Sequence, residues 1–108
     1  MKYIKKDEAL DSFTRQIREN LGDRLKRIIL FGSRARGDEV PDSDYDCLVV
    51  VHEISRNVKD IVDETAGEVL YQYNAVISAF IISEEKYQRQ SYDSILMNIA
   101  KEGIALGE

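Results

Sequence analysis

The chain of 108 residues carries 20 acidic and 15 basic side chains, which gives a formal net charge of −5. This length fits one domain, so we expect residues 1–108 to form a single domain with its own core and no second substrate-binding domain. The negative charge provides no general attraction to nucleic acid, so direct nucleic-acid binding and templated polymerisation are not expected.

Cys47 is the only cysteine, which excludes an intramolecular disulfide. Because it opens an apolar run, burial in the core is its expected role rather than reactivity as a nucleophile. The sequence shows no signal peptide and no apolar span of about 20 residues. These observations lead us to expect a cytoplasmic protein without a membrane segment.

The first expected helix begins at Asp7, whose side chain can cap the first turn. Its apolar residues recur at helical spacing and carry the pattern up to and slightly past Gly22. These positions are Leu10, Phe13, Ile17, Leu21 and Leu25. The stripe predicts a scaffold helix that packs against the core.

Two short apolar runs follow, residues 27–31 and 47–51. Each predicts a buried strand, and the first ends at Gly32. Because side chains alternate along a strand, Asp44 and Asp46 are expected on one face, roughly 6.5 to 7 Å apart. Two such carboxylates repel each other unless a cation lies between them, and oxygen ligands of this kind suit Mg²⁺ bound together with substrate phosphates.

The turn after the first strand supplies groups that bind phosphate. Gly32 allows a close approach to the backbone, and Ser33 offers its hydroxyl and can open a helical turn whose N–H groups favour anions. Arg34 and Arg36 follow, where a guanidinium either neutralises phosphate oxygens or lies on the loop surface, and the sequence leaves both roles open. With the carboxylates, this turn predicts a site for a metal-chelated nucleoside triphosphate.

A calcium-binding loop is an alternative interpretation of Asp42, Asp44 and Asp46. The sixth position of such a loop would be Cys47, where an EF-hand requires glycine, and the next positions form an apolar run typical of a strand. We therefore reject the calcium-loop interpretation on backbone grounds.

The second half of the chain continues the alternation of helices and strands. Ser55 is expected to cap a long amphipathic helix that reaches Tyr73. Residues 75–82 then predict a third strand, and Ser83 with two following glutamates marks another helix start. A last short helix is expected around residues 95–100, with Gly103 at its C-terminal end. This order predicts an α/β (α+β) domain in two or three layers, with a small mixed β-sheet flanked by helices.

The spacing Gly32-Ser33, ten residues, then Asp44-Tyr45-Asp46 resembles the signature of the polymerase-beta-like nucleotidyltransferase superfamily. The fuller string Gly-Ser-Arg-Ala-Arg-Gly followed by Ser-Asp-Tyr-Asp resembles its small prokaryotic branch, the minimal nucleotidyltransferases (MNT). The resemblance implies the nucleotidyltransferase fold, which is similar to the polymerase-beta palm. A similar order of elements extends over nearly the whole chain.

The resemblance also implies roles for the matched residues. The catalytic residues would be Asp44, Asp46 and Ser33, and the metal ligands would be Asp44 and Asp46, which bind Mg²⁺. The residues expected to bind the nucleotide are Gly32, Ser33, Arg34 and Arg36. ATP as the nucleotide substrate is carried over from the family, because the sequence contains no motif for base recognition.

The third strand departs from the superfamily pattern. Active members normally carry a further carboxylate there, which helps to bind the catalytic metal or accepts the proton of the attacking hydroxyl. Ser78 occupies that place, and no Asp or Glu occurs between Glu68 and Glu84. Loss of a general base typically costs about 10² to 10⁴ in rate, whereas phosphoryl transfer depends mainly on positioning and charge neutralisation. The sequence leaves open whether catalysis or only nucleotide binding persists.

The resemblance implies transfer of AMP from MgATP to a hydroxyl, with pyrophosphate as the leaving group. Partners in this family are typically small helical HEPN-domain proteins, often RNase toxins, so the acceptor would be a tyrosine of such a toxin and this chain its antitoxin. The alternative is a catalytically impaired binding module that neutralises its partner by stoichiometric complex formation. A weaker possibility is transfer to a small molecule such as an aminoglycoside, which needs a homodimer to build the acceptor pocket. The sequence does not decide between homo- and hetero-oligomers.

Overall fold

The centre of the computed structural model is a four-stranded mixed sheet, and the described residues are 7–36, 44–89, 99 and 102–106. The strands are β1 (Leu25–Phe31), β2 (Tyr45–Val51), β3 (Ile77–Ser83) and β4 (Ile104–Ala105), in the order β3-β2-β1-β4. β1 pairs antiparallel with β2 and β4, while β2 and β3 are parallel. The predicted small mixed sheet is therefore confirmed.

Helix α1 (Glu8–Leu21) begins at the predicted cap, where the Leu10 N–H donates to Asp7 Oδ1 at 3.0 Å. The prediction that this helix continues past Gly22 is wrong. Gly22 has a φ of 56° and its N–H donates to the Arg18 carbonyl, so the helix ends at Leu21. A 3₁₀ turn (Gly22–Arg24) then leads into β1.

Helix α3 (Arg56–Tyr73) connects the parallel strands β2 and β3, as a parallel pair requires a crossover. Its predicted cap is present, because the Val58 N–H donates to Ser55 Oγ at 3.2 Å. The helix ends at Asn74, which has a left-handed conformation with a φ of 54°. Both ends of the predicted helix are thus set by local residues.

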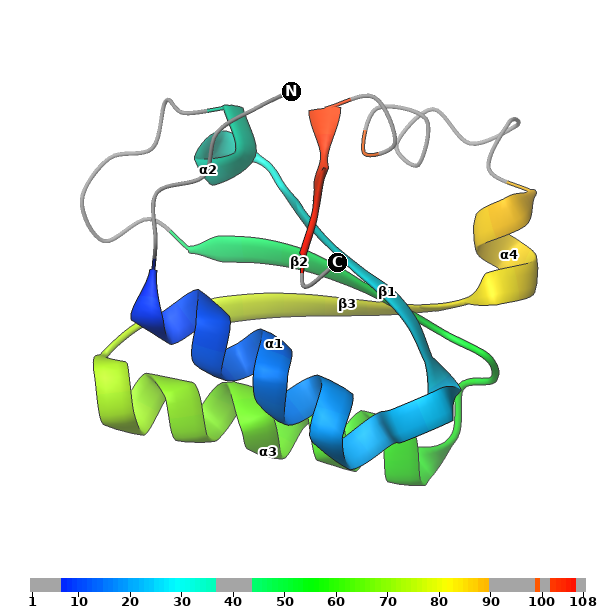
Figure 1. The fold of residues 1–108 in the computed structure, drawn as a ribbon, viewed down its shortest axis with the longest axis horizontal. Helices are drawn as coiled ribbons and strands as arrows, with labels where there is room; N and C mark the ends of the chain where they lie inside the picture. The colour runs from blue at the N-terminus through cyan, green and yellow to red at the C-terminus, as the bar shows by residue number, and fades with distance from the viewer. Residues whose placement is uncertain (1–6, 37–43, 90–98, 100–101, 107–108) are drawn as a thin grey trace.

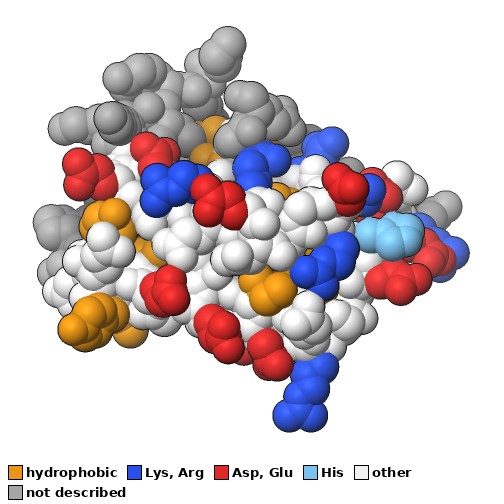
Figure 2. All heavy atoms as spheres, turned by 60° about the horizontal axis from the view of Figure 1, so that its bottom comes forward, with side chains coloured by type: hydrophobic (Ala, Val, Ile, Leu, Met, Phe, Trp, Pro, Cys, Tyr) orange, Lys and Arg blue, Asp and Glu red, His pale blue; other side chains and the backbone are white. Residues whose placement is uncertain are grey.

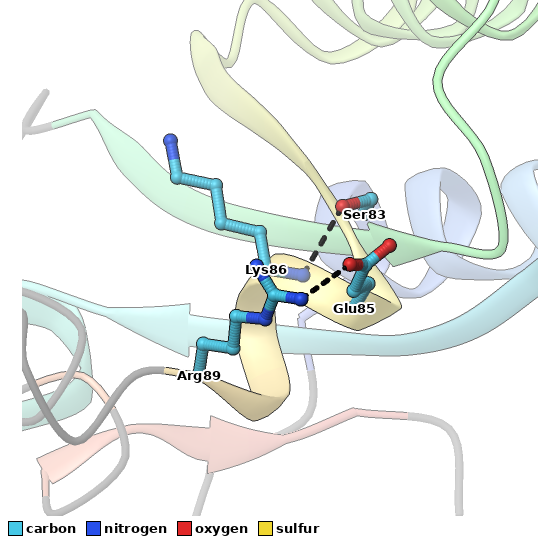
Figure 3. Close-up of polar contacts among 4 residues, drawn as sticks. All are labelled: Ser83, Glu85, Lys86 and Arg89. Atoms are coloured by element: carbon cyan, nitrogen blue, oxygen red, sulfur yellow. Dashed lines mark hydrogen bonds and ion pairs between the residues drawn. The ribbon is translucent and has the colours of Figure 1, made fainter.

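Helix α4 (Glu84–Gln88) follows β3 directly, as predicted from Ser83. Ser83 Oγ accepts a hydrogen bond from the Lys86 N–H at 3.2 Å, and Arg89 forms an ion pair with Glu85 at 2.8 Å (Figure 3). Most of the last predicted helix, residues 95–100, lies outside the described residues. No described helix is long and apolar enough to cross the hydrocarbon layer of a membrane.

Two apolar clusters cover the two faces of the sheet. α1 and α3 pack against one face (Figure 1), and the larger cluster there includes Phe13, Ile17 and Val49, all without solvent exposure. The second cluster, on the opposite face, contains Leu48, Val50, Ile82 and Ile99. The outer surface of the α1–α3 layer carries charged side chains of both signs (Figure 2).

Strand β4 is an element that the sequence did not predict. Its two residues pair with Ile29 and Leu30 of β1. Nearby, the Leu106 N–H donates to the Ile28 carbonyl, and Arg18 Nη2 donates to the Leu106 carbonyl, both at 2.9 Å. The segment after Gly103 is therefore tied to both the sheet and α1.

Candidate functional site

Asp46 lies near the start of β2, between two neighbouring strands. In the register of the sheet it is opposite Phe31 of β1 and Ser78 of β3. Residues paired in this way project from the same face of a sheet. That face is the one opposite α1 and α3, because Leu48 and Val50, which alternate with Cys47 and Val49 along β2, belong to the second cluster.

Asp44 precedes β2 and is exposed. Its Oδ2 accepts a hydrogen bond from Ser78 Oγ at 3.2 Å. This contact brings the Asp44 carboxylate to the side of the sheet from which Asp46 projects. Ser78, which the sequence placed at the position of a third carboxylate, is thus a neighbour of both acids.

The backbone turn at Gly32 packs directly against Asp46. Gly32 has a φ of 76°, and a Cβ atom at this position would overlap Asp46 Oδ2. Helix α2 (Ser33–Arg36) starts immediately after this turn. The side chains of Ser33 and Arg36 lie outside the described part of the structure. The predicted phosphate-binding turn and the predicted metal-binding carboxylates are therefore adjacent.

Arg34 makes a contact that the sequence did not predict. Its guanidinium carbon lies 3.8 Å from the centroid of the Tyr45 ring, which is a cation–π contact. Tyr45 is buried in the cluster against α1 and α3, and its hydroxyl donates to Asp7 Oδ2 at 2.5 Å. Arg34 is thereby linked through Tyr45 to the first turn of α1.

Sequence reasoning missed the contribution of Tyr45. A usable signal was present, because strand alternation directs the residue between Asp44 and Asp46 toward the opposite face, where the helices pack. Its hydrogen bond to Asp7 and its contact with Arg34 depend on the tertiary arrangement. Asp7 therefore has two functions, as the cap of α1 and as an acceptor for Tyr45.

Cys47 is fully buried, as expected from the sequence. Burial, with a smaller contribution from the nearby Asp46 charge, raises the pKa of the Cys47 thiol to about 12. A thiol that stays protonated is a poor nucleophile. Cys47 is thus a core residue rather than a part of the reactive centre.

Two phenylalanines lie on the same face as the carboxylates. Phe31 and Phe80 have ring centroids 5.8 Å apart and an interplanar angle of 50°. Phe80 is opposite Leu48 in the sheet register and 52% of its surface is exposed. From the sequence, both residues belong only to predicted strands, although alternation along β3 places Phe80 on the face of Ser78.

The donor set is compatible with magnesium that is bound together with a phosphate chain. No group of three or more His, Cys, Asp and Glu side chains suited to a metal ion occurs among the residues that the structure describes. Mg²⁺ usually takes only one or two protein carboxylates and completes its shell with phosphate oxygens and water. Asp44 and Asp46, next to the Gly32 turn, supply that number of carboxylates.

Solved structures of toxin–antitoxin complexes have a similar fold. One, described as a toxin-antitoxin with AMP-PNP, matches with a TM-score of 0.64 and 19% identity over 90% of this chain and 71% of that chain. Another contains a tri-AMPylated Shewanella oneidensis HEPN toxin in complex with an MNT antitoxin. It matches with a TM-score of 0.58 and 18% identity over 92% of this chain and 69% of that chain. At this identity, the likeness shows the shared nucleotidyltransferase fold.

Two curated proteins of Methanocaldococcus jannaschii are similar in sequence. "Putative protein adenylyltransferase MJ0604" is 33% identical over 103 residues, which are 95% of this chain and 99% of that protein. MJ0141, which has the same descriptive name, is 37% identical over 68% of this chain and 76% of its own length. The family model described as "Nucleotidyltransferase domain" matches residues 10–106. Since this match covers well over half of the chain, including the whole described sheet, the chain belongs to the nucleotidyltransferase domain family.

Proposed function

We propose that this chain transfers AMP from MgATP to a hydroxyl group of another protein, with release of pyrophosphate. The observation that carries the proposal is the adjacency of the Gly32 turn, Asp46 and the Asp44–Ser78 pair on one face of the sheet. The names of the Methanocaldococcus jannaschii relatives support AMP as the transferred group.

The geometry suggests that the turn and the acids bind different parts of MgATP. In the proposal, the backbone at Gly32 and Ser33 holds the β- and γ-phosphates, and Asp44 and Asp46 hold Mg²⁺. When bound, the ion neutralises negative charge that develops at the α-phosphate. Ser33 and Arg36 are proposed to add contacts to the phosphates, and Arg34, stacked on Tyr45, stiffens the turn that carries them.

The reaction exchanges one phosphorus–oxygen bond for another. The acceptor oxygen bonds to the α-phosphorus while the bond from that phosphorus to the pyrophosphate oxygen breaks. Ser78 donates its hydrogen bond to Asp44, so it orients that carboxylate and does not act as a base. In the proposal, the hydroxyl proton passes to water or to a group of the acceptor protein.

The proposed acceptor is a tyrosine of a HEPN-domain partner, for which this chain serves as the antitoxin. The similar complex of a tri-AMPylated HEPN toxin with an MNT antitoxin supports this choice of partner. A second candidate function is a binding module that neutralises its partner without turnover. The serine at the position of the third carboxylate favours this candidate.

Asp44→Ala distinguishes the two functions. The wild-type chain, incubated with MgATP and a HEPN-domain protein encoded beside it, is expected to add one or more AMP units to that protein. Asp44→Ala should lower the rate at least about 10²-fold, because it removes a preorganised charge from the reaction centre. Intact-mass spectrometry of the partner measures the transfer.

The exposed Asp60 on α3 provides a matched control, since Asp60→Ala removes a carboxylate far from the sheet face that carries Asp44. This variant is expected to transfer AMP at the wild-type rate. Inhibition of the partner's RNase activity without any change in its mass would reject the enzyme and leave the binding module.

A further inference from the structure

We infer that the edge strand β3 receives the acceptor, and that Phe80 makes the site selective for a hydroxyl carried on an aromatic ring, the tyrosine side chain of a partner protein. The inference rests on the proposed function and assigns the part of that site that binds the acceptor. It identifies a surface for the acceptor, whereas the turn and the carboxylates concern only the nucleotide.

The direction of approach follows from the order of the strands. In nucleotidyl transfer the attacking and leaving oxygens lie roughly in line on opposite sides of the α-phosphorus. The Gly32 turn, which follows β1, contacts Asp46 from the β1 side. Pyrophosphate held by this turn therefore leaves toward β1 and α2. An acceptor on the other side of Asp46, where β3 lies, would then be in line with the leaving pyrophosphate.

The surface on that side is apolar and accessible. β3 is at the edge of the described sheet, and Ser78 and Phe80 project from the face of Asp46. Phe80 is 52% exposed, and Val76, just before the strand, is 45% exposed. None of the seven residues of β3 is charged. Such a surface suits an aromatic ring better than a sugar or an aminoglycoside, which require hydrogen-bonding or charged partners.

Phe31 holds the Phe80 ring in place. The tilted arrangement of the two rings, with centroids 5.8 Å apart, is one that aromatic pairs favour. Because Phe31 is packed against the second apolar cluster, it limits the positions open to Phe80. A half-exposed ring on the same face as Ser78 offers a contact for a third ring whose hydroxyl reaches the carboxylates.

Phe80→Ala tests the inference, because its effects on the acceptor and on the nucleotide can be measured separately. We expect the KM for the HEPN-domain acceptor to rise about tenfold, which is the size of one aromatic contact. The calorimetric affinity for MgAMP-CPP, a non-hydrolysable ATP analogue, should stay unchanged. Phe80→Tyr retains the ring and should restore the KM, and a thermal melt of each variant confirms that it is folded.

Tyr71→Ala is the matched control. Tyr71 is 93% exposed on α3, in the layer that covers the opposite face of the sheet, so its removal should leave the acceptor KM unchanged. An unchanged KM in Phe80→Ala would overturn the inference. So would weaker binding of MgAMP-CPP alone, because the ring would then contact the adenine. If the wild-type chain transfers no AMP at all, both the proposed function and the acceptor site are rejected.

Discussion

At Gly32 the absence of a side chain has two separate consequences. The positive φ of 76° is a conformation that residues with a Cβ adopt at a cost. The space where a Cβ would lie is occupied by Asp46 Oδ2. Gly22 also has a positive φ, of 56°, but a Cβ atom there would meet open space, so only Gly32 combines a positive φ with steric overlap.

Gly32→Ala is therefore expected to cost more stability than Gly22→Ala. The Gly22 variant should lose about 1 kcal/mol in the free energy of unfolding, from backbone strain alone. The Gly32 variant should lose a further 1 to 3 kcal/mol, roughly the cost of overpacking, because the Asp46 carboxylate must move. Urea denaturation measures both free energies.

The same pair of variants also tests the site. Displacement of Asp46 should abolish calorimetric binding of MgAMP-CPP by Gly32→Ala, while Gly22→Ala binds it with wild-type affinity. Equal losses of stability in the two variants, together with normal nucleotide binding, would show that contact between the turn and Asp46 is unimportant.

At the scale of the elements, local signals predicted the starts of the helices. Asp7, Ser55 and Ser83 cap α1, α3 and α4 through hydrogen bonds to residues three positions later. Such contacts involve only near neighbours in the sequence, so they can be predicted from a sequence pattern. The end of α1 was placed wrongly because Leu25 continues the helical apolar spacing, although Gly22 had already changed the direction of the chain.

Non-local contacts could not be predicted in the same way. β4 has only two residues, too few for an alternating pattern, and exists because it pairs with β1. At the candidate site, alternation correctly gave the common face of Asp44 and Asp46. The stacking of Arg34 on Tyr45 and the contact between Phe31 and Phe80 depend on how distant elements pack.

The variant Gly67→Ala tests how much helix propensity in α3 contributes to the free energy of unfolding. Gly67 lies in the interior of this helix, is exposed, and has no atom within 4 Å of its virtual Cβ. Gly67→Ala should therefore raise the free energy of unfolding by about 0.5 to 1 kcal/mol, because alanine loses less backbone entropy in a helix. Urea denaturation measures the gain, and AMP transfer should be unaffected. A loss of stability would mean that the α3 surface is more tightly packed than the structure indicates.

At the scale of the whole molecule, one face of the sheet packs in the main core and the other carries the candidate site. α1 and α3 fill one face with the larger apolar cluster, and the other face carries the carboxylates and the phenylalanine pair. Asp46 and Cys47 are consecutive and therefore project to opposite faces. The carboxylate faces the candidate site, whereas the thiol lies in the core with a pKa raised to about 12.

Because of this raised pKa, the free energy of unfolding depends on pH in the alkaline range. The ordinary thiol pKa is 9.0, so between pH 9 and pH 12 the unfolded chain loses the Cys47 proton while the folded chain keeps it. The contribution to stability is fully present below pH 9. As the pH rises through this interval, stability falls by about 1.4 kcal/mol per pH unit for this one group.

Cys47→Ala should remove this contribution to the alkaline slope. The variant is expected to be less stable near pH 8, because it leaves a small cavity in the core. Its free energy of unfolding should then fall less steeply than that of the wild type between pH 9 and 10.5, because the substitution removes the thiol whose pKa differs between the folded and unfolded chain. Urea denaturation at several pH values measures the two slopes. Parallel slopes would mean that the thiol ionises in the folded protein as readily as in the unfolded chain, and that the core around it admits water.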